Sequence, residues 1–250
     1  MKSLRVSVVA VGAAAALFAA PSAVAAEPEP VKHGTPSGAA APESAVAGAV
    51  NPAARPEPCT GVYRDDARLG PDHLARKRQG PVGPLLKGYN RTGGLGAKTF
   101  LKKYWEGPAD TGGWKYPPND GFAEVNGEID RRATALVPGQ RLDRFGSEFG
   151  SYLAPAGDSC AKRALPPQNL NTREPAHPCD YRVYRVARTF TVWQGSIAPW
   201  FGQPGGGRQI KLDPLLLNPG AGQRLSVKWL LENGYLTHAT AERTAVAASS

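Results

Sequence analysis

Apolar and polar residues alternate along several short segments in the second half of the chain. This pattern predicts strands at 141–145, 151–154, 181–193 and 208–212, and the third segment slips once, which indicates a bulge. Helices are expected at 96–105, where apolar residues recur every three or four positions, and at 226–233, which begins with a serine cap and is followed by glycine. Short strands, few helices and no regular strand–helix alternation favour an α+β fold over a doubly wound parallel sheet.

Composition divides the chain into five parts. Residues 1–26 have the basic start, apolar stretch and small residues of a signal peptide, and the apolar stretch is shorter than the about 20 residues that a membrane anchor needs. Residues 27–56 form an Ala- and Pro-rich leader with little to bury, so we expect disorder there. We assign 57–112 to a small accessory subdomain with one helix, 113–238 to the main domain and 239–250 to a flexible tail. An exported protein with no membrane span is expected.

The chain is basic, with a formal net charge of +9. A basic surface suits an anionic partner. Basic residues are not interleaved with aromatic ones, so nucleic acid is not predicted as the partner. The sequence contains no Cys-x-x-Cys, no paired histidines, no P-loop and no Rossmann turn, and therefore predicts neither a metal site nor a cofactor.

Three cysteines allow one disulfide and one free thiol. Cys160 and Cys179 are the favoured pair, because they bracket a Pro- and Asn-rich excursion. Cys59 paired with either of them is the competing arrangement, and it would join the N-terminal segment to the core.

The usual catalytic sets are absent. The four histidines lie at positions 33, 73, 177 and 238 without a nucleophile elbow or a spacing that joins an acid to a base, and this disfavours serine hydrolases and ribonucleases. His177 stays a weak candidate. The most unusual segment is 197–209, where Trp200 and Phe201 precede three glycines that lie between two glutamines. Glycine lets a backbone approach a ligand closely, and aromatic faces can stack on a planar ring, so this turn suits a nucleotide-sized ligand.

Four motifs occur in one order: Tyr116-Pro-Pro-Asn-Asp-Gly-Phe122, Leu142-Asp-Arg-Phe-Gly146, Arg163-Ala-Leu-Pro-Pro167 and the glycine turn. Together they resemble the tuberculosis necrotizing toxin (TNT) domain family of NAD+ glycohydrolases, over roughly residues 114–236. The resemblance implies a compact α+β domain with a small mixed or antiparallel sheet, preceded by the helical accessory segment. It also implies hydrolysis of NAD+ and NADP+ without a cofactor.

The resemblance assigns roles to individual residues. Gln209 and Arg144 match the catalytic positions, and Gln203 is the alternative glutamine if the alignment shifts across the turn. The positions that match substrate-binding residues are Arg163, Phe145, Tyr152, Gln203 and Gly207. Such a set suits cleavage of the N-ribosyl bond, because nicotinamide leaves as a neutral base and the protein has mainly to position the substrate and stabilise a ribosyl cation.

The sequence is also compatible with two other functions. An ADP-ribosyltransferase would capture the same cation with a protein side chain, although no Glu-x-Glu pair lies near Gln209. A secreted nucleotide-binding or interaction module would keep the pocket without the chemistry. The resemblance also admits an immunity or inhibitor protein and a homodimer as partners.

Overall fold

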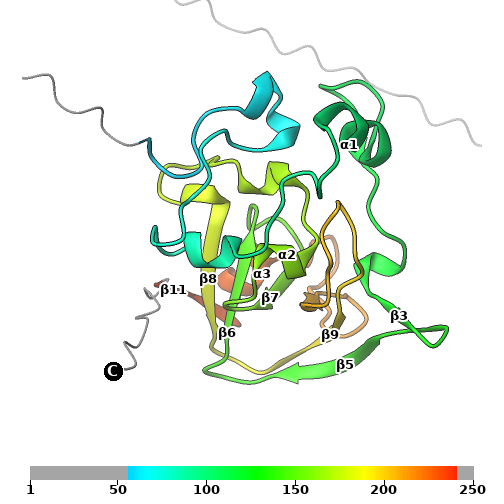
Figure 1. The fold of residues 1–250 in the computed structure, drawn as a ribbon. Helices are drawn as coiled ribbons and strands as arrows, with labels where there is room; N and C mark the ends of the chain where they lie inside the picture. The colour runs from blue at the N-terminus through cyan, green and yellow to red at the C-terminus, as the bar shows by residue number, and fades with distance from the viewer. Residues whose placement is uncertain (1–55, 241–250) are drawn as a thin grey trace, which may run out of the picture. The chain divides into compact units, whose positions relative to one another are not determined.

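The computed structural model describes residues 56–240 of the 250-residue chain (Figure 1). The predicted signal peptide, all but the last residue of the predicted leader, and the predicted tail beyond residue 240 lie outside these residues. The described part contains three α-helices: α1 (Ala97–Tyr104), α2 (Cys160–Arg163) and α3 (Val227–Glu232). Its 3-10 helices are η1 (Tyr63–Asp65), η2 (Ala67–Leu69), η3 (Gly83–Leu86), η4 (Asn119–Gly121), η5 (Pro167–Leu170) and η6 (Pro178–Asp180).

A seven-stranded sheet forms the centre of the fold. Its strands follow the order β11-β8-β6-β7-β10-β9-β5, and every neighbouring pair is antiparallel. They are β5 (Arg131–Leu136), β6 (Arg141–Phe145), β7 (Tyr152–Pro155), β8 (Tyr181–Val186), β9 (Phe190–Ser196), β10 (Arg208–Lys211) and β11 (Leu236–Ala239). Two small antiparallel pairs flank the sheet, β1 (Trp105–Glu106) with β2 (Gly113–Trp114), and β3 (Glu124–Val125) with β4 (Glu128–Ile129). The α+β class and the antiparallel sheet expected from the sequence are confirmed.

The sheet differs from the sequence expectation in one long strand. The predicted strand 181–193 is two strands, because the chain leaves the sheet after Val186 and re-enters at Phe190. The backbone N–H groups of Ala187 and Arg188 both donate to Tyr235 O, and β8 and β9 are not neighbours in the sheet. The slip in alternation therefore marks a crossing between distant strands rather than a bulge.

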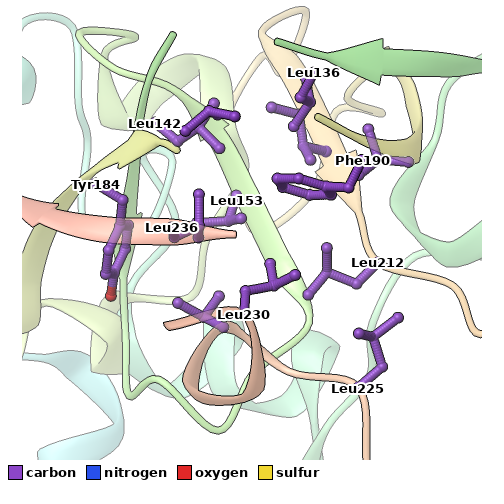
Figure 2. Packing of buried hydrophobic residues seen from close by; sticks show 13 residues of the cluster. Leu136, Leu142, Leu153, Tyr184, Phe190, Leu212, Leu225, Leu230 and Leu236 are labelled. Atoms are coloured by element: carbon purple, nitrogen blue, oxygen red, sulfur yellow. The ribbon is translucent and has the colours of Figure 1, made fainter. Parts of the chain in front are cut away.

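The main hydrophobic core lies where α3 packs against the sheet (Figure 2). Tyr184 and Val192 of the sheet and Leu230 of α3 are fully buried in it. Ser226 caps α3, since its side chain accepts a hydrogen bond from Trp229 N, as the sequence predicted. The helix therefore presents a fixed apolar side to the sheet.

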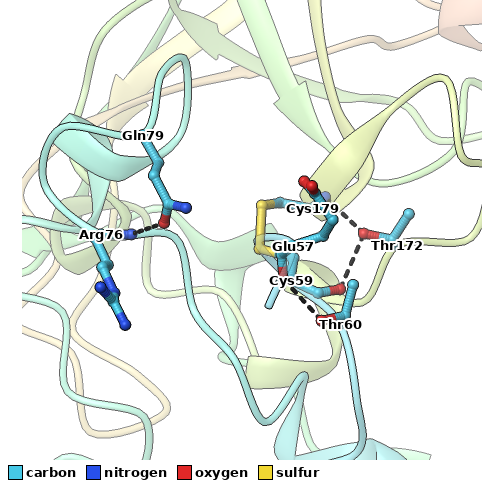
Figure 3. Close-up of a disulfide and its surroundings, with 7 residues drawn as sticks. All are labelled: Glu57, Cys59, Thr60, Arg76, Gln79, Thr172 and Cys179. Carbon is cyan, nitrogen blue, oxygen red and sulfur yellow. Dashed lines mark hydrogen bonds between the residues drawn. A yellow bond between two sulfur atoms is a disulfide. The ribbon is translucent and has the colours of Figure 1, made fainter. Parts of the chain in front are cut away.

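A second cluster joins the accessory segment to β6 and β8. Val82 and Leu85 of this segment pack with Phe145 and Val183. The disulfide links Cys59 to Cys179, and Thr172 Oγ1 connects the backbones on its two sides by donating to Cys59 O and accepting from Cys179 N (Figure 3). The favoured pairing of Cys160 with Cys179 is wrong. Cys160 is buried as a free thiol at the start of α2.

A third, mostly aromatic cluster holds the glycine turn. Phe201 is buried against Phe100 and Tyr104 of α1 and against Trp114. The helix expected at 96–105 is confirmed, and its apolar side supports the turn that leads into β10. Within residues 56–240, no helix is long and apolar enough to cross a membrane.

Candidate active site

A pocket opens where β6, β7 and β10 meet. Residues of these three strands form most of its walls. The rest comes from α2, from the residue Leu165 that follows it, and from Ile197, directly after β9. The lining residues are Asp143, Arg144, Phe145, Tyr152, Leu153, Ala154, Arg163, Leu165, Ile197 and Gln209. Five residues singled out from the sequence meet here: Arg144, Phe145, Tyr152, Arg163 and Gln209. Motifs that are distant in sequence thus form one site.

Gln209 lies on β10, paired with Gly195 of β9. Its Nε2 donates to the backbone oxygen of Asp120 at 2.9 Å, while its Oε1 makes no hydrogen bond within residues 56–240. Gly121 makes room for this amide, since a Cβ at position 121 would lie 3.1 Å from Oε1, and the glycine has φ +85°. The Asn-Asp-Gly turn of the first motif therefore packs directly on Gln209.

Arg144 is buried without a carboxylate in direct contact among the described residues, and the Asp180 carboxylate acts on it only at longer range. Its Nε donates to Ser147 O at 2.8 Å and its Nη1 donates to Tyr152 O at 2.6 Å, and it forms no ion pair among the described residues. The loop 146–150 wraps around it so closely that a Cβ at Gly150 would lie 1.9 Å from Arg144 Nη2. Burial lowers the pKa of this guanidinium. An anion at the pocket would stabilise the charge, so the site favours a negatively charged ligand.

Arg163 is buried in a different environment. It donates from Nη1 and Nη2 to the two carboxylate oxygens of Asp143, at 2.5 and 2.8 Å, and from Nε to Asp158 O. Burial opposes the charge, but the Asp143 carboxylate outweighs it and the pKa of Arg163 is raised. Asp143 also accepts from Tyr181 Oη at 2.8 Å and from Gly157 N. Arg163 is therefore neutralised within the pocket wall.

Phe145 and Tyr152 supply the aromatic part of the lining. The Phe145 ring is buried, with its centroid 4.8 Å from that of Tyr181 and 5.4 Å from the Arg163 guanidinium carbon. Tyr152 is half-buried, and burial raises the pKa of its phenol, so the hydroxyl stays protonated near neutral pH. These rings supply an aromatic part of the pocket lining.

Gln203 and Gly207 do not line the pocket. The buried Gln203 side chain donates through Nε2 to Asn90 O and accepts from Asn90 N at 3.4 Å. Gly207 contacts α2, where a Cβ would lie 2.8 Å from Lys162 O. The glycines of the turn thus allow close approach to the chain's own backbone, and the burial of Phe201 leaves no free face for a ligand ring.

Sequence reasoning missed the charged group beside Gln209. The Asp120 carboxylate lies 2.8 Å from Lys211 Nζ and 3.5 Å from Arg131 Nη1. The position of Lys211 could have been inferred from the sequence, since it follows Gln209 by two positions on a strand and must lie on the same face. Its partner Asp120 on η4 could not have been inferred, because their contact depends on how the loop folds back.

His177 lies at a separate pocket with His238, away from Gln209 and Arg144. Within residues 56–240, no group of three or more histidine, cysteine, aspartate or glutamate side chains is arranged to hold a metal ion. The site described above is therefore built from an amide, an unbalanced guanidinium and aromatic rings.

The chain is similar to several known proteins. A sequence model of the tuberculosis necrotizing toxin family matches residues 135–239. The conidial surface nicotinamide adenine dinucleotide glycohydrolase nadA of Aspergillus fumigatus is 43% identical over 163 residues, which cover 62% of this chain and 69% of the relative. Among solved structures, tuberculosis necrotizing toxin complexed with its immunity factor IFT is 26% identical, with a TM-score of 0.44 over 57% of this chain and 71% of that one. Tse6 in complex with Tsi6 is 17% identical, with a TM-score of 0.26 over 44% and 72%.

Proposed function

Because this chain belongs to the tuberculosis necrotizing toxin family, we propose that it is an NAD+ glycohydrolase. It hydrolyses the N-ribosyl bond of NAD+, and of NADP+, to nicotinamide and ADP-ribose or its phosphate. The observation that carries this proposal is the meeting of Gln209 and Arg144 at one pocket, from two motifs that are 65 positions apart.

The reaction needs little proton transfer to the leaving group. The bond between the ribose C1′ and the nicotinamide nitrogen breaks, the bonding electrons stay with the nitrogen, and neutral nicotinamide leaves. Water then forms the new bond to C1′ and releases one proton to solvent. The transition state carries positive charge on the ribose, so the protein acts through position and fixed dipoles rather than through a strong acid or base.

The pocket offers a group for each part of the substrate. Arg144 binds the pyrophosphate, because its cation has no carboxylate partner within the described residues. Phe145 and Tyr152 form the walls of the space for the planar nicotinamide ring. Gln209 contacts the reacting ribose with a neutral amide. Arg163 pairs with Asp143 in the pocket wall and does not bind phosphate.

Location and partners are proposed on family membership. We propose that the chain is exported, with residues 1–26 as its signal peptide, as a relative is a conidial surface protein. A protein inhibitor and a second copy of the chain are proposed as partners. Residues 57–112 are proposed as an accessory segment and 113–238 as the catalytic domain, although β11 extends one residue beyond that boundary.

Release of nicotinamide from NAD+ by the purified protein tests the function. Gln209→Ala should fold as the parent does and lose nearly all turnover. Gln140→Ala is the matched control, because this glutamine is exposed in the turn before β6 and its side chain accepts a hydrogen bond from Val137 N, outside the pocket lining. A parent protein that binds NAD+ without releasing nicotinamide would be a binding module, and transfer of ADP-ribose to protein would identify a transferase.

A further inference from the structure

We propose that Asp120 is a positioning residue that fixes the Gln209 amide, so that Gln209 acts through Oε1 as a hydrogen-bond acceptor. This inference rests on the proposed function and names the atom and the supporting residue that the hydrolysis uses. It concerns the turn at η4, to which the reaction as proposed above assigns no residue.

The orientation of the amide follows from its partner. A backbone oxygen can only accept a hydrogen bond, so the group of Gln209 that faces Asp120 O must be the NH2. The ambiguity between nitrogen and oxygen that affects most side-chain amides is thereby removed. Oε1 has no partner in residues 56–240 and is the amide atom left for the substrate.

Asp120 is itself held from two strands. Its backbone is left-handed, with φ 56° and ψ 20°, and its carboxylate pairs with Lys211 of β10 and Arg131 of β5. Arg131 is paired in register with Gly195, which is also the neighbour of Gln209. The carboxylate is 40% exposed, so these pairs serve geometry more than stability.

An acceptor suits the chemistry better than a donor. Positive charge develops on the ribose as nicotinamide leaves, and an oxygen dipole directed at it, or at a ribose hydroxyl, stabilises that charge. An NH2 group in the same place would oppose it. The turn therefore selects the useful end of an amide that is otherwise free to rotate by half a turn.

Gln209→Glu gives the sharpest test. A protonated glutamic acid can donate to Asp120 O and still present an acceptor oxygen, whereas a carboxylate turns two acceptors toward each other. The charged groups around position 209 are Asp120, Lys211, Arg131 and Arg144, together with the Asp143–Arg163 pair. We expect Gln209→Glu to release nicotinamide at low pH and to lose this activity as pH rises through its carboxyl pKa, without a matching loss in the parent. Activity that rises with pH, or its absence at every pH in a folded variant, would overturn the proposal.

Asp120→Asn tests the positioning role. Asparagine tolerates the left-handed backbone but removes the ion pairs, so we expect kcat to fall about tenfold with KM changed less than about twofold. Lys211→Met should reproduce the loss, and Lys211→Arg should restore most of it. In a Gln209→Ala background, Asp120→Asn should cause no further loss, because the group that it positions is gone.

Asp213→Asn is the matched control. Asp213 also lies beside Lys211, at 4.0 Å, but it accepts from Trp193 Nε1 and Leu215 N rather than supporting Gln209. Equal kcat for Asp120→Asn and the parent would refute the positioning role while leaving the NADase function intact. A parent that releases no nicotinamide would instead refute the proposed function.

Discussion

Two arginines at the pocket have the same side chain and opposite roles. Arg163 is neutralised by Asp143 in a buried pair, whereas Arg144, within residues 56–240, donates only to backbone oxygens. A neutralised guanidinium gains little from a phosphate, whereas an unbalanced one gains a charge-assisted hydrogen bond. The motifs Asp-Arg-Phe-Gly and Arg-Ala-Leu-Pro-Pro marked both residues, but no sequence pattern states which carboxylate an arginine will meet.

Arg144→Ala should chiefly weaken substrate binding. The variant removes the unbalanced cation, and we expect KM for NAD+ to rise by about tenfold or more, since a hydrogen bond to a charged group is worth about 1.5–3 kcal/mol. Steady-state kinetics of nicotinamide release measure it. Arg185→Ala, which changes an exposed arginine on β8, is the control. An unchanged affinity for NAD+ would remove Arg144 from the phosphate site.

The Asp143–Arg163 pair should show its effect in stability. Arg163→Ala leaves a fully buried carboxylate without its cation, and we expect the free energy of unfolding to fall by about 3–5 kcal/mol. Removing Asp143 as well should cost less than the sum of the two single changes, because no buried charge then remains. Urea denaturation of the two single variants and the double variant measures this coupling. Strict additivity would contradict the pairing.

At the scale of elements, the interior of the sheet was predictable and its edges were not. The ranges 141–145, 151–154 and 208–212 were predicted as strands from their alternating residues, and β6, β7 and β10 form there. Edge strand β5 is mostly exposed and offers no such alternation, so it was missed. The break between β8 and β9 was missed because the alternation resumes after its one slip, and the slip was interpreted as a bulge. An alternation of apolar and polar residues indicates which positions of a strand are buried. It does not indicate which other strand lies beside it in the sheet.

The glycine turn shows the same limit. Its residues were recognisable as a special turn, but their contacts are with α2 and the segment near Asn90. Gly93 and Gly202 meet so closely that a Cβ on Gly202 would lie 2.6 Å from Gly93 Cα. Such a contact depends on two loops that are distant in sequence, and no local pattern encodes it.

Gln203→Ala should destabilise this turn. The change removes the hydrogen bond that the buried Gln203 side chain donates to Asn90 O, so we expect the free energy of unfolding to fall by about 0.5–1.5 kcal/mol. Thermal unfolding followed by circular dichroism measures the loss, and Gln140→Ala is again the exposed control. A variant as stable as the parent would show that the contact with Asn90 contributes nothing.

For the whole molecule, the disulfide decides how the accessory segment is attached. Cys59 and Cys179 are 120 positions apart, so the bond joins the start of the described chain to η6, directly before β8. Beside Cys179, Asp180 pairs with Arg182, which donates to Gly146 O at the loop around Arg144. A short path of contacts therefore connects the disulfide to the pocket. The sequence favoured the pairing of Cys160 with Cys179 because a loop between two nearby cysteines can be recognised from the sequence. A contact between segments 120 residues apart cannot.

Changing both bonded cysteines, in Cys59→Ala with Cys179→Ala, should lower the free energy of unfolding by about 2–5 kcal/mol. The closed loop is long, so its opening frees much conformational entropy in the unfolded chain. Urea denaturation of the oxidised parent and the double variant measures the difference, and nicotinamide release at a temperature where both are folded shows how far the pocket depends on the bond.

Cys160→Ala separates this arrangement from the alternative. Burial raises the pKa of the Cys160 thiol to about 12, so the native protein should resist thiol reagents and react at one site only after unfolding. If Cys160 were bonded to Cys179, Cys160→Ala would free a second thiol and carry the larger loss of stability, and Cys59→Ala would free none. With Cys59 bonded to Cys179, the unfolded Cys160→Ala variant should show no thiol, since its two remaining cysteines form the disulfide, and Cys59→Ala should show two. The thiol count thus tests the attachment of the accessory segment independently of any activity.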